Sequence, residues 1–507
     1  MTVTPVPLPL PLTSPDSSAS SASPADPASP KSRGRGLRPS RRTVLAAGVG
    51  GTATALVLGA AAPAEPSVSA DAISAAAVRE EYLHGWRGYQ DVAWGHDEAR
   101  PISRTTHDFF APGHTFGLSI VEALDTLFLM GEDAEVIRCC DWIEQHFDPV
   151  QNADVQIFEV VIRLVGGLLA GYQATQRPAL LARARELADR LLPAFTASPT
   201  GMPYTHVNLR TGAVRGKVAA LAEIGSNAME FGLLSRLTGD ARYYDASLRA
   251  YRAVISRRSA LDLLGTSIDV ETGRWADCTS VAPNAPVDSF YEYLCNGGAL
   301  LRDAQLSSWY QTLTAAILRH QAVRAGGRLW FRSVDFRTGR PNGPTTQLEL
   351  GAFYAGLLGK GGAVREGSAY FDSWTAVLER HPVLPESIDY TTLAPLDRSG
   401  QLRPEYANSA FDLWRITGDE HYKECAFRWF LAMRDRQRVP GGYTNLRDVT
   451  APAGSARSYD DLTPGYWFAE NLKYLWLMFS GTPRFDYRVG MLSTEGKALA
   501  GLRPQWL

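Results

Sequence analysis

The stretch Leu234-Ser235-Arg236-Leu237-Thr238-Gly239-Asp240, followed by Tyr243, recurs as Leu413-Trp414-Arg415-Ile416-Thr417-Gly418-Asp419, followed by Tyr422. In each copy we expect a helix to end at the glycine, which readily takes the left-handed conformation that closes a helix. The aspartate can then cap the next helix, and the tyrosine can pack back against the first. The repeated unit is therefore predicted to be a helical hairpin.

Helical periodicity continues on both sides of these two copies. Apolar side chains recur every three or four residues, as in Ile157, Val160, Val161, Leu164, Leu168 and Leu169. This spacing gives a helix one apolar face, whereas runs with strand periodicity are short and scattered. Six or seven helical hairpins in succession can close on themselves and bury an inner ring. We therefore predict an all-α fold, a single α/α toroid over residues 71–507 with short β-hairpins in its loops.

The first 70 residues have a different composition. Eight prolines and seven serines fill half of positions 1–30, so this leader is predicted to be disordered. The pair Arg41-Arg42 then precedes a small-residue apolar stretch that begins at Val44, with cleavage motifs near Ala64 and Ala70. This order predicts a twin-arginine signal peptide and a secreted protein. A permanent membrane anchor is disfavoured, because the stretch is rich in Gly, Ala and Thr.

The bulk composition excludes several classes of protein. The 507 residues are 45% apolar and carry a formal net charge of −2, which gives no field for binding nucleic acid. The five cysteines form no CxxC pair and no Cys/His cluster at zinc spacing. Cys278 and Cys295 could bridge after export or remain free buried thiols.

Acidic side chains stand in helical segments where apolar residues would be expected. Glu159 and Arg163 are four residues apart and so share one face of a helix. Asp288 opens another such segment, and Glu470 lies within a third. Singly, each acid is typical of a helix cap or a surface ion pair. Together they suggest carboxylates that converge on a cavity, raise one another's pKa and form acid–base pairs.

At this point the chain resembles glycoside hydrolase family 47, the class I α-1,2-mannosidases. The resemblance runs from Ala93-Trp94-Gly95-His96-Asp97-Glu98 through Ile120-Val121-Glu122-Ala123-Leu124-Asp125-Thr126-Leu127 to Ser493-Thr494-Glu495. It implies an (αα)7 barrel that binds Ca²⁺ and hydrolyses terminal α-1,2-linked mannose of oligosaccharides or mannoproteins with inversion. We expect a monomer whose partner is a mannose-containing glycan.

The resemblance also implies roles for single residues. Glu159 matches the proton donor, Asp288 the carboxylate beneath the scissile sugar, and Glu405 the base. Glu386 looks like the acid of the preceding Pro-Glu motif, and Thr494 corresponds to the calcium ligand. The supporting residues for substrate binding are Arg163, Glu230, Arg403, Tyr466, Glu470 and Glu495. Because Arg163 favours an ionised Glu159, the proton donor stays open among Glu159, Asp288 and Glu386.

Some positions depart from the family pattern. Pro286 replaces an arginine, Asn408 a glutamate and Glu349 a histidine, while Ala352 replaces a half-cystine, so the family's usual disulfide is not expected. These departures leave open a calcium-dependent protein that binds mannose glycans with little or no turnover. A third alternative is another α/α-toroid enzyme, such as a sugar epimerase. It is disfavoured because the nine histidines lie mostly outside the acidic segments.

Overall fold

The computed structural model describes residues 70–455 and 458–507. The predicted leader and twin-arginine signal peptide therefore lie outside the described residues, except for Ala70, which begins the first helix.

Inner and outer helices alternate along the described chain. The inner helices are α2 (Leu118–Met130), α4 (Ile157–Glu159) continued by η1 (Val160–Val165) and α5 (Gly166–Thr175), α7 (Leu221–Gly225) with α8 (Ala228–Thr238), α10 (Asp288–Leu301), η2 (Glu349–Phe353) with α12 (Tyr354–Lys360), α14 (Glu405–Thr417), and η4 (Trp467–Asn471) with α16 (Leu472–Phe479). The outer helices are α1 (Ala70–Ala93), α3 (Asp133–His146), α6 (Pro178–Thr196), α9 (Arg242–Ile255), α11 (Ala304–His320), α13 (Val364–Leu378) and α15 (His421–Gln437). A short turn, η5 (Pro504–Trp506), follows near the C-terminus.

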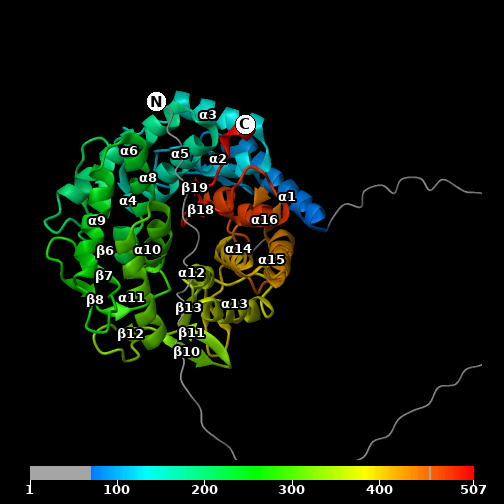
Figure 1. Cartoon of the computed structure of the whole chain (residues 1–507). Helices are drawn as coiled ribbons and strands as arrows, with labels where there is room; N and C mark the ends of the chain where they lie inside the picture. The colour runs from blue at the N-terminus through cyan, green and yellow to red at the C-terminus, as the bar shows by residue number, and fades with distance from the viewer. Residues whose placement is uncertain (1–69, 456–457) are drawn as a thin grey trace, which may run out of the picture. The chain divides into compact units, whose positions relative to one another are not determined.

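The seven inner elements of the described residues form a closed ring. Each packs against the next one along the chain, and the last, η4 with α16, packs against α2 as well as against the outer helix α1. Figure 1 shows the succession of colours around this ring, with red α16 returning beside blue α1. The predicted (αα)7 barrel is confirmed.

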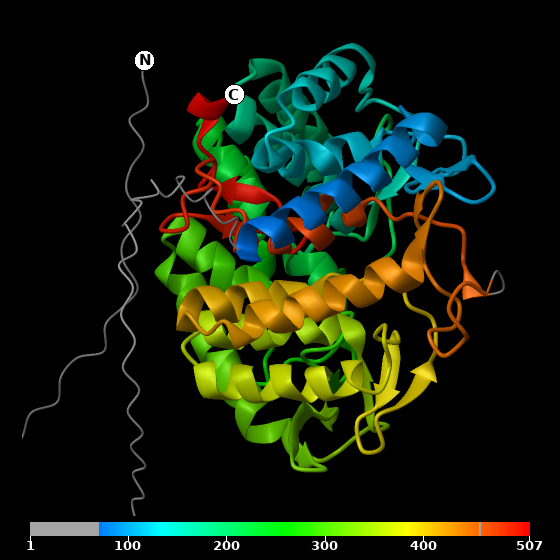
Figure 2. The ribbon, with the colours of Figure 1, turned by 90° about the vertical axis from the view of Figure 1, so that its right-hand side faces the viewer.

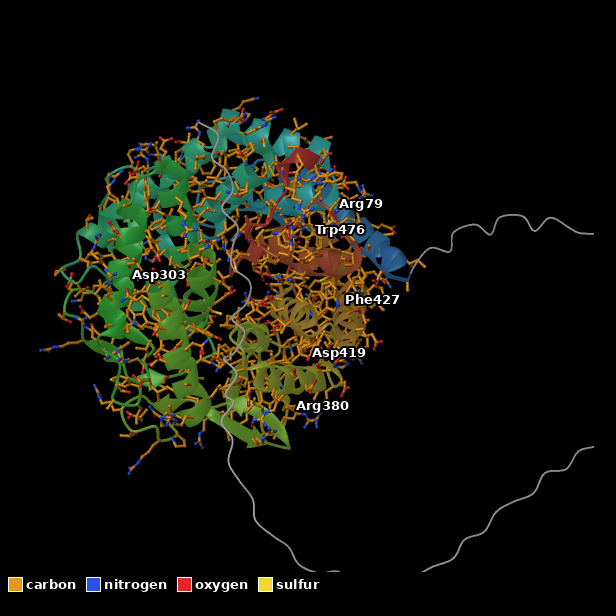
Figure 3. All side chains as sticks on the ribbon, viewed as in Figure 1. Arg79, Asp303, Arg380, Asp419, Phe427 and Trp476 are labelled. Carbon is orange, nitrogen blue, oxygen red and sulfur yellow. The ribbon has the colours of Figure 1, made fainter. Side chains whose placement is uncertain are left out.

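The repeated hairpin motif has the predicted local structure. Helices α8 and α14 end at Gly239 and Gly418, whose φ angles of 74° and 70° are left-handed. In the second copy, the Asp419 carboxylate accepts a 3.0 Å hydrogen bond from the backbone N–H of His421, the first residue of α15. Asp419 is labelled in Figure 3. Tyr243 and Tyr422 are both buried, as expected for side chains that pack back on the hairpin.

Short strands connect the helices and pair antiparallel. Three-stranded sheets are formed by β3 (Asp154–Gln156) with β4 (His206–Asn208) and β5 (Val214–Arg215), by β6 (Val218–Ala220) with β7 (Ser267–Asp269) and β8 (Trp275–Asp277), and by β13 (Thr346–Leu348) with β14 (Ser387–Asp389) and β15 (Ala394–Asp397). The strand pairs are β1 (Glu98–Arg100) with β2 (Thr105–His107), β9 (Thr279–Ser280) with β12 (Val334–Asp335), β10 (Ala322–Ala325) with β11 (Arg328–Phe331), β16 (Arg438–Val439) with β17 (Gly442–Tyr443), and β18 (Met491–Leu492) with β19 (Ala498–Ala500).

The strands divide between the two ends of the ring. Figure 2 shows the yellow and orange strands at one end of the helices and the red C-terminal hairpin β18–β19 at the other. This hairpin packs against the inner helices α5, α8 and α10. Its turn, residues 493–497, therefore lies against the interior of the ring.

One inner helix is unusually apolar. Among the described residues, only the continuous helix Ile157–Thr175 is long and apolar enough to cross a membrane, and 78% of its most apolar window is buried in the fold. It packs closely on α2: a β-carbon added to Gly167 would come within 2.6 Å of the Val121 side chain. The segment is therefore accounted for as a core helix.

The five cysteines all lie in the described part of the chain and are all free thiols. Of the two outcomes considered for Cys278 and Cys295, the structure has the unpaired one. The stability of the ring therefore rests on packing between its helices.

Candidate active site

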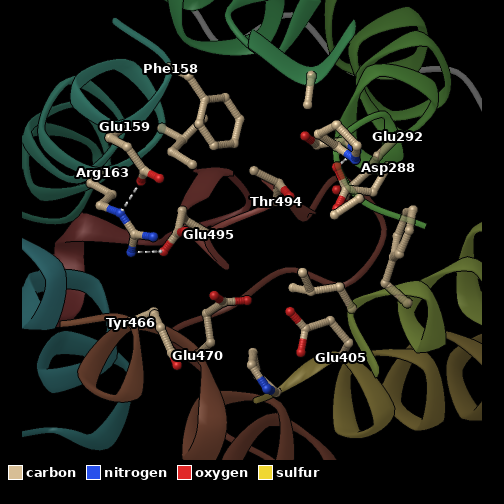
Figure 4. A pocket seen from close by; sticks show the side chains of 18 of the residues that line it. Phe158, Glu159, Arg163, Asp288, Glu292, Glu405, Tyr466, Glu470, Thr494 and Glu495 are labelled. Carbon is tan, nitrogen blue, oxygen red and sulfur yellow. Dashed lines mark hydrogen bonds and ion pairs between the residues drawn. The ribbon is translucent and has the colours of Figure 1, made fainter. Parts of the chain in front are cut away.

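A single cavity inside the ring collects most of the predicted site residues. Its volume is about 570 Å³, within the usual range for sites that bind small molecules. Nine of the eleven predicted residues line it: Glu159, Arg163, Asp288, Arg403, Glu405, Tyr466, Glu470, Thr494 and Glu495. Figure 4 shows eight of these nine side chains around the cavity, contributed by different inner helices and by the β18–β19 turn. The remaining two, Glu230 and Glu386, lie outside the lining.

Arg163 joins three acids on one side of the cavity. Its Nε donates a 2.6 Å hydrogen bond to Glu159, and its Nη1 donates one of 2.9 Å to Glu495 (Figure 4). The Nη1 also lies 3.6 Å from a carboxylate oxygen of Glu122. Burial alone would lower the pKa of Arg163, but these three carboxylates together hold that pKa well above its ordinary value. The arginine therefore stays charged, and it fixes the orientation of Glu159.

The inner helix that carries Glu159 and Arg163 departs from regular α geometry. Val160–Val165 forms a π-helical turn, and Trp467–Asn471 forms another on the far side of α2. Such turns insert an extra residue and are frequent at functional sites. Here they occur at the segments that carry Arg163 and Glu470.

The first two turns of α10 contribute one acid each to the opposite side of the cavity. Asp288 is the first residue of this helix and accepts a 3.0 Å hydrogen bond from the backbone N–H of Ser289. Burial raises the pKa of Asp288 to about 6, although the Ser289 hydrogen bond and the nearby charge of Arg403 oppose this shift. Burial likewise raises the pKa of Glu292, one turn further along, to about 7.

Glu405 begins α14, and its neighbours set its charge. Burial raises the pKa of Glu405 to about 7, against the opposing charge of Arg403. Arg403 itself is engaged by Glu386: its Nε lies 3.2 and 3.1 Å from the two carboxylate oxygens, and its Nη2 lies 3.1 Å from one of them. Glu386 does not line the cavity, and its carboxylate holds Arg403, which does; its catalytic role stays a prediction.

Glu230 lies deeper in the wall of the ring. It is fully buried on α8, and one of its oxygens accepts a 2.8 Å hydrogen bond from the hydroxyl of Tyr293. Its other oxygen has no hydrogen-bond partner among the described residues. Burial raises the pKa of Glu230 to about 8. Glu230 does not line the cavity, but its charge can influence the site.

The turn between β18 and β19 places Thr494 at the cavity. The backbone N–H of Gly496 donates to the Ser493 carbonyl at 2.9 Å, and Gly496 takes a left-handed φ of 61°. Figure 4 shows Thr494 between the acids of the two sides. The turn is therefore held in a conformation that directs Thr494 toward the carboxylates.

The donor set around Thr494 fits a hard cation. Within the described residues, no three His, Cys, Asp or Glu side chains are grouped as a direct metal cage. Thr494 can offer a hydroxyl and a carbonyl oxygen, while Glu292, Glu470 and Glu495 surround it in the cavity lining and can hold coordinated water. Burial and the charges of Glu495 and Glu405 raise the pKa of Glu470 well above its ordinary value. A bound cation would offset this crowding of carboxylates.

Sequence reasoning did not assign a role to three acids that the structure places at the site. Glu292 lines the cavity, Glu122 pairs with Lys497 and approaches Arg163, and Glu349 lies beside Glu405. The sequence contains a feature that could have identified two of these three acids. Glu292 stands four residues after Asp288, and Glu122 is an acid in a helix whose thirteen residues are all buried. The positions that depart from the family pattern are close as well: Pro286 and Asn408 both line the cavity.

Comparison with known proteins extends these findings. The sequence model of glycosyl hydrolase family 47 matches residues 81–501. The chain is 33% identical over 454 residues to mannosyl-oligosaccharide 1,2-alpha-mannosidase IB of Mus musculus, covering 84% of this chain and 69% of that protein. It is 32% identical over 430 residues to alpha-mannosidase I MNS5 of Arabidopsis thaliana, covering 79% and 73% of the two chains.

A solved structure supports the fold independently. The alpha-1,2-mannosidase from Trichoderma reesei superimposes with a TM-score of 0.75 at 24% identity, covering 85% of this chain and 99% of that one. Since the family match spans most of the ring and the curated relatives exceed 30% identity, this chain is a glycoside hydrolase that belongs to glycosyl hydrolase family 47.

Proposed function

We propose that this chain is a calcium-dependent, inverting exo-α-1,2-mannosidase that removes terminal mannose from oligosaccharides or mannoproteins. The observation that carries the proposal is the convergence of Glu159, Asp288, Glu405 and Thr494 on one cavity inside the ring. The linkage is supported by the curated relatives, which are named as 1,2-alpha-mannosidases or alpha-mannosidase I.

The shape of the site supports attack at a chain end. The β18–β19 turn occupies the interior of the ring and contributes Thr494 and Glu495 to the cavity. Gln156 and Ala220, at the ends of strands β3 and β6, also line it. A glycan that enters past these strands would meet the turn with its terminal sugar first, which favours the removal of single terminal residues.

The arrangement of carboxyl groups supports hydrolysis by direct attack of water. An inverting glycosidase keeps its acid and its base about 6.5–9.5 Å apart, so that a water molecule fits between the base and the sugar. Glu159 lies on one side of the cavity, and Asp288 and Glu405 lie on the other (Figure 4). Glu405 is the base of the proposal: it accepts a proton from the attacking water, and Arg403 favours its ionised form.

The leaving oxygen needs a proton, and two residues can deliver it. Asp288 is buried and its pKa is raised to about 6, so it holds a proton more readily than an ordinary aspartate. Glu159 is bound to Arg163 at 2.6 Å and would transfer a proton through water. An aryl α-mannoside with a good leaving group separates the two routes. The variants to compare are Asp288→Asn and Glu159→Gln. The variant that lacks the proton donor should hydrolyse the aryl mannoside at nearly the original rate but should hydrolyse mannobiose much more slowly.

Calcium, when bound, supplies a Lewis acid that holds sugar hydroxyls and the attacking water in position. The residues that would hold it are Thr494, through its hydroxyl and carbonyl oxygens, and the water-binding acids Glu292, Glu470 and Glu495. These side chains remain in place as hydrogen-bond acceptors that orient the sugar and exclude bulk water.

The test of the proposal is the release of mannose from an α-1,2-linked mannobiose by the purified chain. We expect release in calcium, loss of release in chelator, and recovery when calcium is restored. An absence of release in calcium would contradict the activity, and full release in chelator would contradict the calcium requirement.

A second function is favoured by two lining residues. Pro286 and Asn408 replace charged residues of the family pattern inside the cavity and could leave a protein that binds mannose glycans with little turnover. Calcium-dependent binding of mannobiose that persists for hours without release of mannose would establish this alternative.

The location and assembly of the protein are part of the proposal. A secreted monomer is expected to consist of one catalytic ring, residues 71–507, released from a leader that carries Arg41-Arg42. Replacement of both arginines by lysine should retain the full-length chain in the cytoplasm. Light scattering of the purified chain should give the mass of one copy, and twice that mass would contradict a monomer.

A further inference from the structure

Three carboxyl oxygens, one on the proposed base and two on a neighbouring glutamate, have no hydrogen-bond donor among the described residues. They are both oxygens of Glu349 and the Oε2 of Glu405, and all three atoms are buried. Glu349 is 1% exposed, so water does not solvate its carboxyl group freely. Leaving a buried acceptor unpaired is costly, and ionised acceptors are the most costly of all. A hydrogen-bond donor is therefore needed next to these three oxygens.

Each of the two carboxyl groups is a candidate partner for the other. Glu349 begins η2 and Glu405 begins α14, and these two elements pack against each other. Contact between the two side chains acts on the pKa of both acids. The backbone N–H of Glu349 donates to the Glu386 carbonyl at 2.9 Å, which anchors the segment. Two carboxylates cannot donate to each other, so a hydrogen bond between them requires a proton on one.

The charged groups around the pair do not supply another donor. Arg403 is the cation that acts on both acids, but its side-chain hydrogen bonds within the described chain go to Glu386 and Gln401. Glu386 adds negative charge to the environment of both acids. Glu470 and Tyr466 are the other titratable groups that face Glu405.

We propose that Glu349 is a positioning residue, which keeps a proton at neutral pH and donates it in a hydrogen bond to Glu405. This bond holds Glu405 as a carboxylate and orients it within the cavity. The inference rests on the proposed role of Glu405 as the base and adds the residue that sets its charge and orientation. Glu405 lines the cavity and Glu349 does not, so Glu349 acts through Glu405.

The electrostatics of the pair agree with this assignment. Burial, and then the charge of Glu405, raise the pKa of Glu349 well above its ordinary value, and the contact with Glu405 raises it further. For Glu405 the same contact opposes the rise that burial causes. Between the two acids, the proton therefore belongs on Glu349.

Two substitutions of similar size separate positioning from packing. Glu349→Gln keeps a donor next to Glu405, whereas Glu349→Met fills the space without one. For mannobiose hydrolysis, we expect kcat of E349M to fall about 10- to 100-fold. The acidic limb of the pH–rate profile of E349M should move to higher pH, because Glu405 loses the donor that favours its ionised form. E349Q should keep the acidic limb of the original chain and lose less than tenfold in kcat.

The result that overturns the proposal is an E349M variant with the rate and the pH profile of the original chain. Equal losses in E349M and E349Q, with unchanged acidic limbs, would also overturn it, because they would show that only packing matters. Circular dichroism and the unfolding midpoint of both variants establish that each is folded before these rates are compared.

A measurement that needs no activity tests the proton directly. Infrared difference spectra of the original chain against E349Q at pH 7 should show loss of a protonated carboxyl band. The control is Glu366→Gln: Glu366 pairs with Arg365 at the surface, and this pairing lowers its pKa, so only a carboxylate band should be lost. A carboxylate band lost from E349Q would overturn the inference. If the chain releases no mannose, the proposed function fails, and the infrared result still decides the proton on Glu349.

Discussion

The Nζ of Lys473 lies 2.8 Å from the Oδ2 of Asp125, at a point where the side chains are 0% and 1% exposed. The same ammonium donates a 2.6 Å hydrogen bond to the carbonyl of Gly496, and Asp125 accepts a 2.8 Å hydrogen bond from the N–H of Ala498. A second buried pair, Lys497 with Glu122, fastens the same turn to α2. Two buried ion pairs, one between α16 and α2 and one between the turn and α2, thus hold the turn that presents Thr494 to the cavity.

Removing one partner of this buried pair should destabilise the fold. We expect Lys473→Met to lower the free energy of unfolding by about 3–5 kcal/mol, because it leaves the Asp125 carboxylate buried without a cation. Urea unfolding, followed by tryptophan fluorescence, measures the change.

The double variant Lys473→Met/Asp125→Asn provides the control, because it removes both charges and keeps an acceptor for the Ala498 N–H. It should recover part of the lost stability. The surface pair Arg365–Glu366 serves for comparison, and Arg365→Met should leave the free energy of unfolding almost unchanged, because solvent screens this pair. A K473M variant as stable as the original chain would show that the pair does not hold the turn.

Removing the charge of the proposed base should stop turnover but not binding. Glu405→Gln keeps the shape of the side chain and cannot accept a proton from water, so we expect kcat to fall by about 10²–10⁴-fold. Calorimetric titration with mannobiose should still show binding. Glu424→Gln, at an exposed position on α15, should leave both quantities unchanged. Near-normal turnover of E405Q would assign the base to another residue.

Replacing the proposed calcium ligand should weaken the metal site. Thr494→Ala removes the hydroxyl oxygen but not the carbonyl oxygen, so calcium affinity should fall about tenfold or more. The midpoint of thermal unfolding, measured against free calcium concentration, reports the affinity without an activity assay. Thr196→Ala, near the end of α6, is the matched control, since its hydroxyl bonds to backbone carbonyls of its own helix. Identical calcium titrations for both variants would contradict the assignment.

The buried acid Glu230 should make stability depend on pH. Burial raises its folded-state pKa from 4.5 to about 8, so the folded chain holds a proton that the unfolded chain loses between these values. Stability should therefore be complete below about pH 4.5 and fall as pH rises toward 8, by up to about 1.4 kcal/mol per pH unit from this group.

Glu230→Gln should remove this contribution while retaining an acceptor for the Tyr293 hydroxyl. Urea unfolding in chelator, from pH 5 to 8, should show E230Q gaining stability relative to the original chain as pH rises. A constant difference between the two chains over this range would mean that Glu230 is ionised throughout.

The sequence predicted the architecture because local patterns and tertiary structure agree here. The helix at Leu234–Thr238 ends at Gly239 and its copy at Leu413–Thr417 ends at Gly418, each through a glycine with a left-handed φ. A glycine in this conformation is a local feature, which a sequence shows directly. The side chains of Asp240 and Asp419 accept hydrogen bonds from the backbone N–H of the first residue of the next helix, as expected. Each of these helices begins one residue later than it would if the aspartate were its N-cap residue.

The site was harder to predict, because it depends on which side chains face inward. Glu386 and Glu405 occur in similar proline-containing motifs, yet Glu405 faces the cavity and Glu386 faces Arg403. No spacing rule separates these outcomes, since both acids lie at junctions between loops and regular elements. The contact of Glu349 with Glu405 joins residues 56 positions apart in the sequence. Such pairings appear only once the ring is closed.

The measurement that tests the central claim most directly is proton NMR of the anomer first released from an α-1,2-linked mannobiose. Direct attack of water in a site that holds calcium predicts β-mannose as the initial product, followed by mutarotation, and no product in chelator. Initial release of α-mannose would contradict the inverting mechanism, and an intact mannobiose in the presence of calcium would contradict hydrolysis itself.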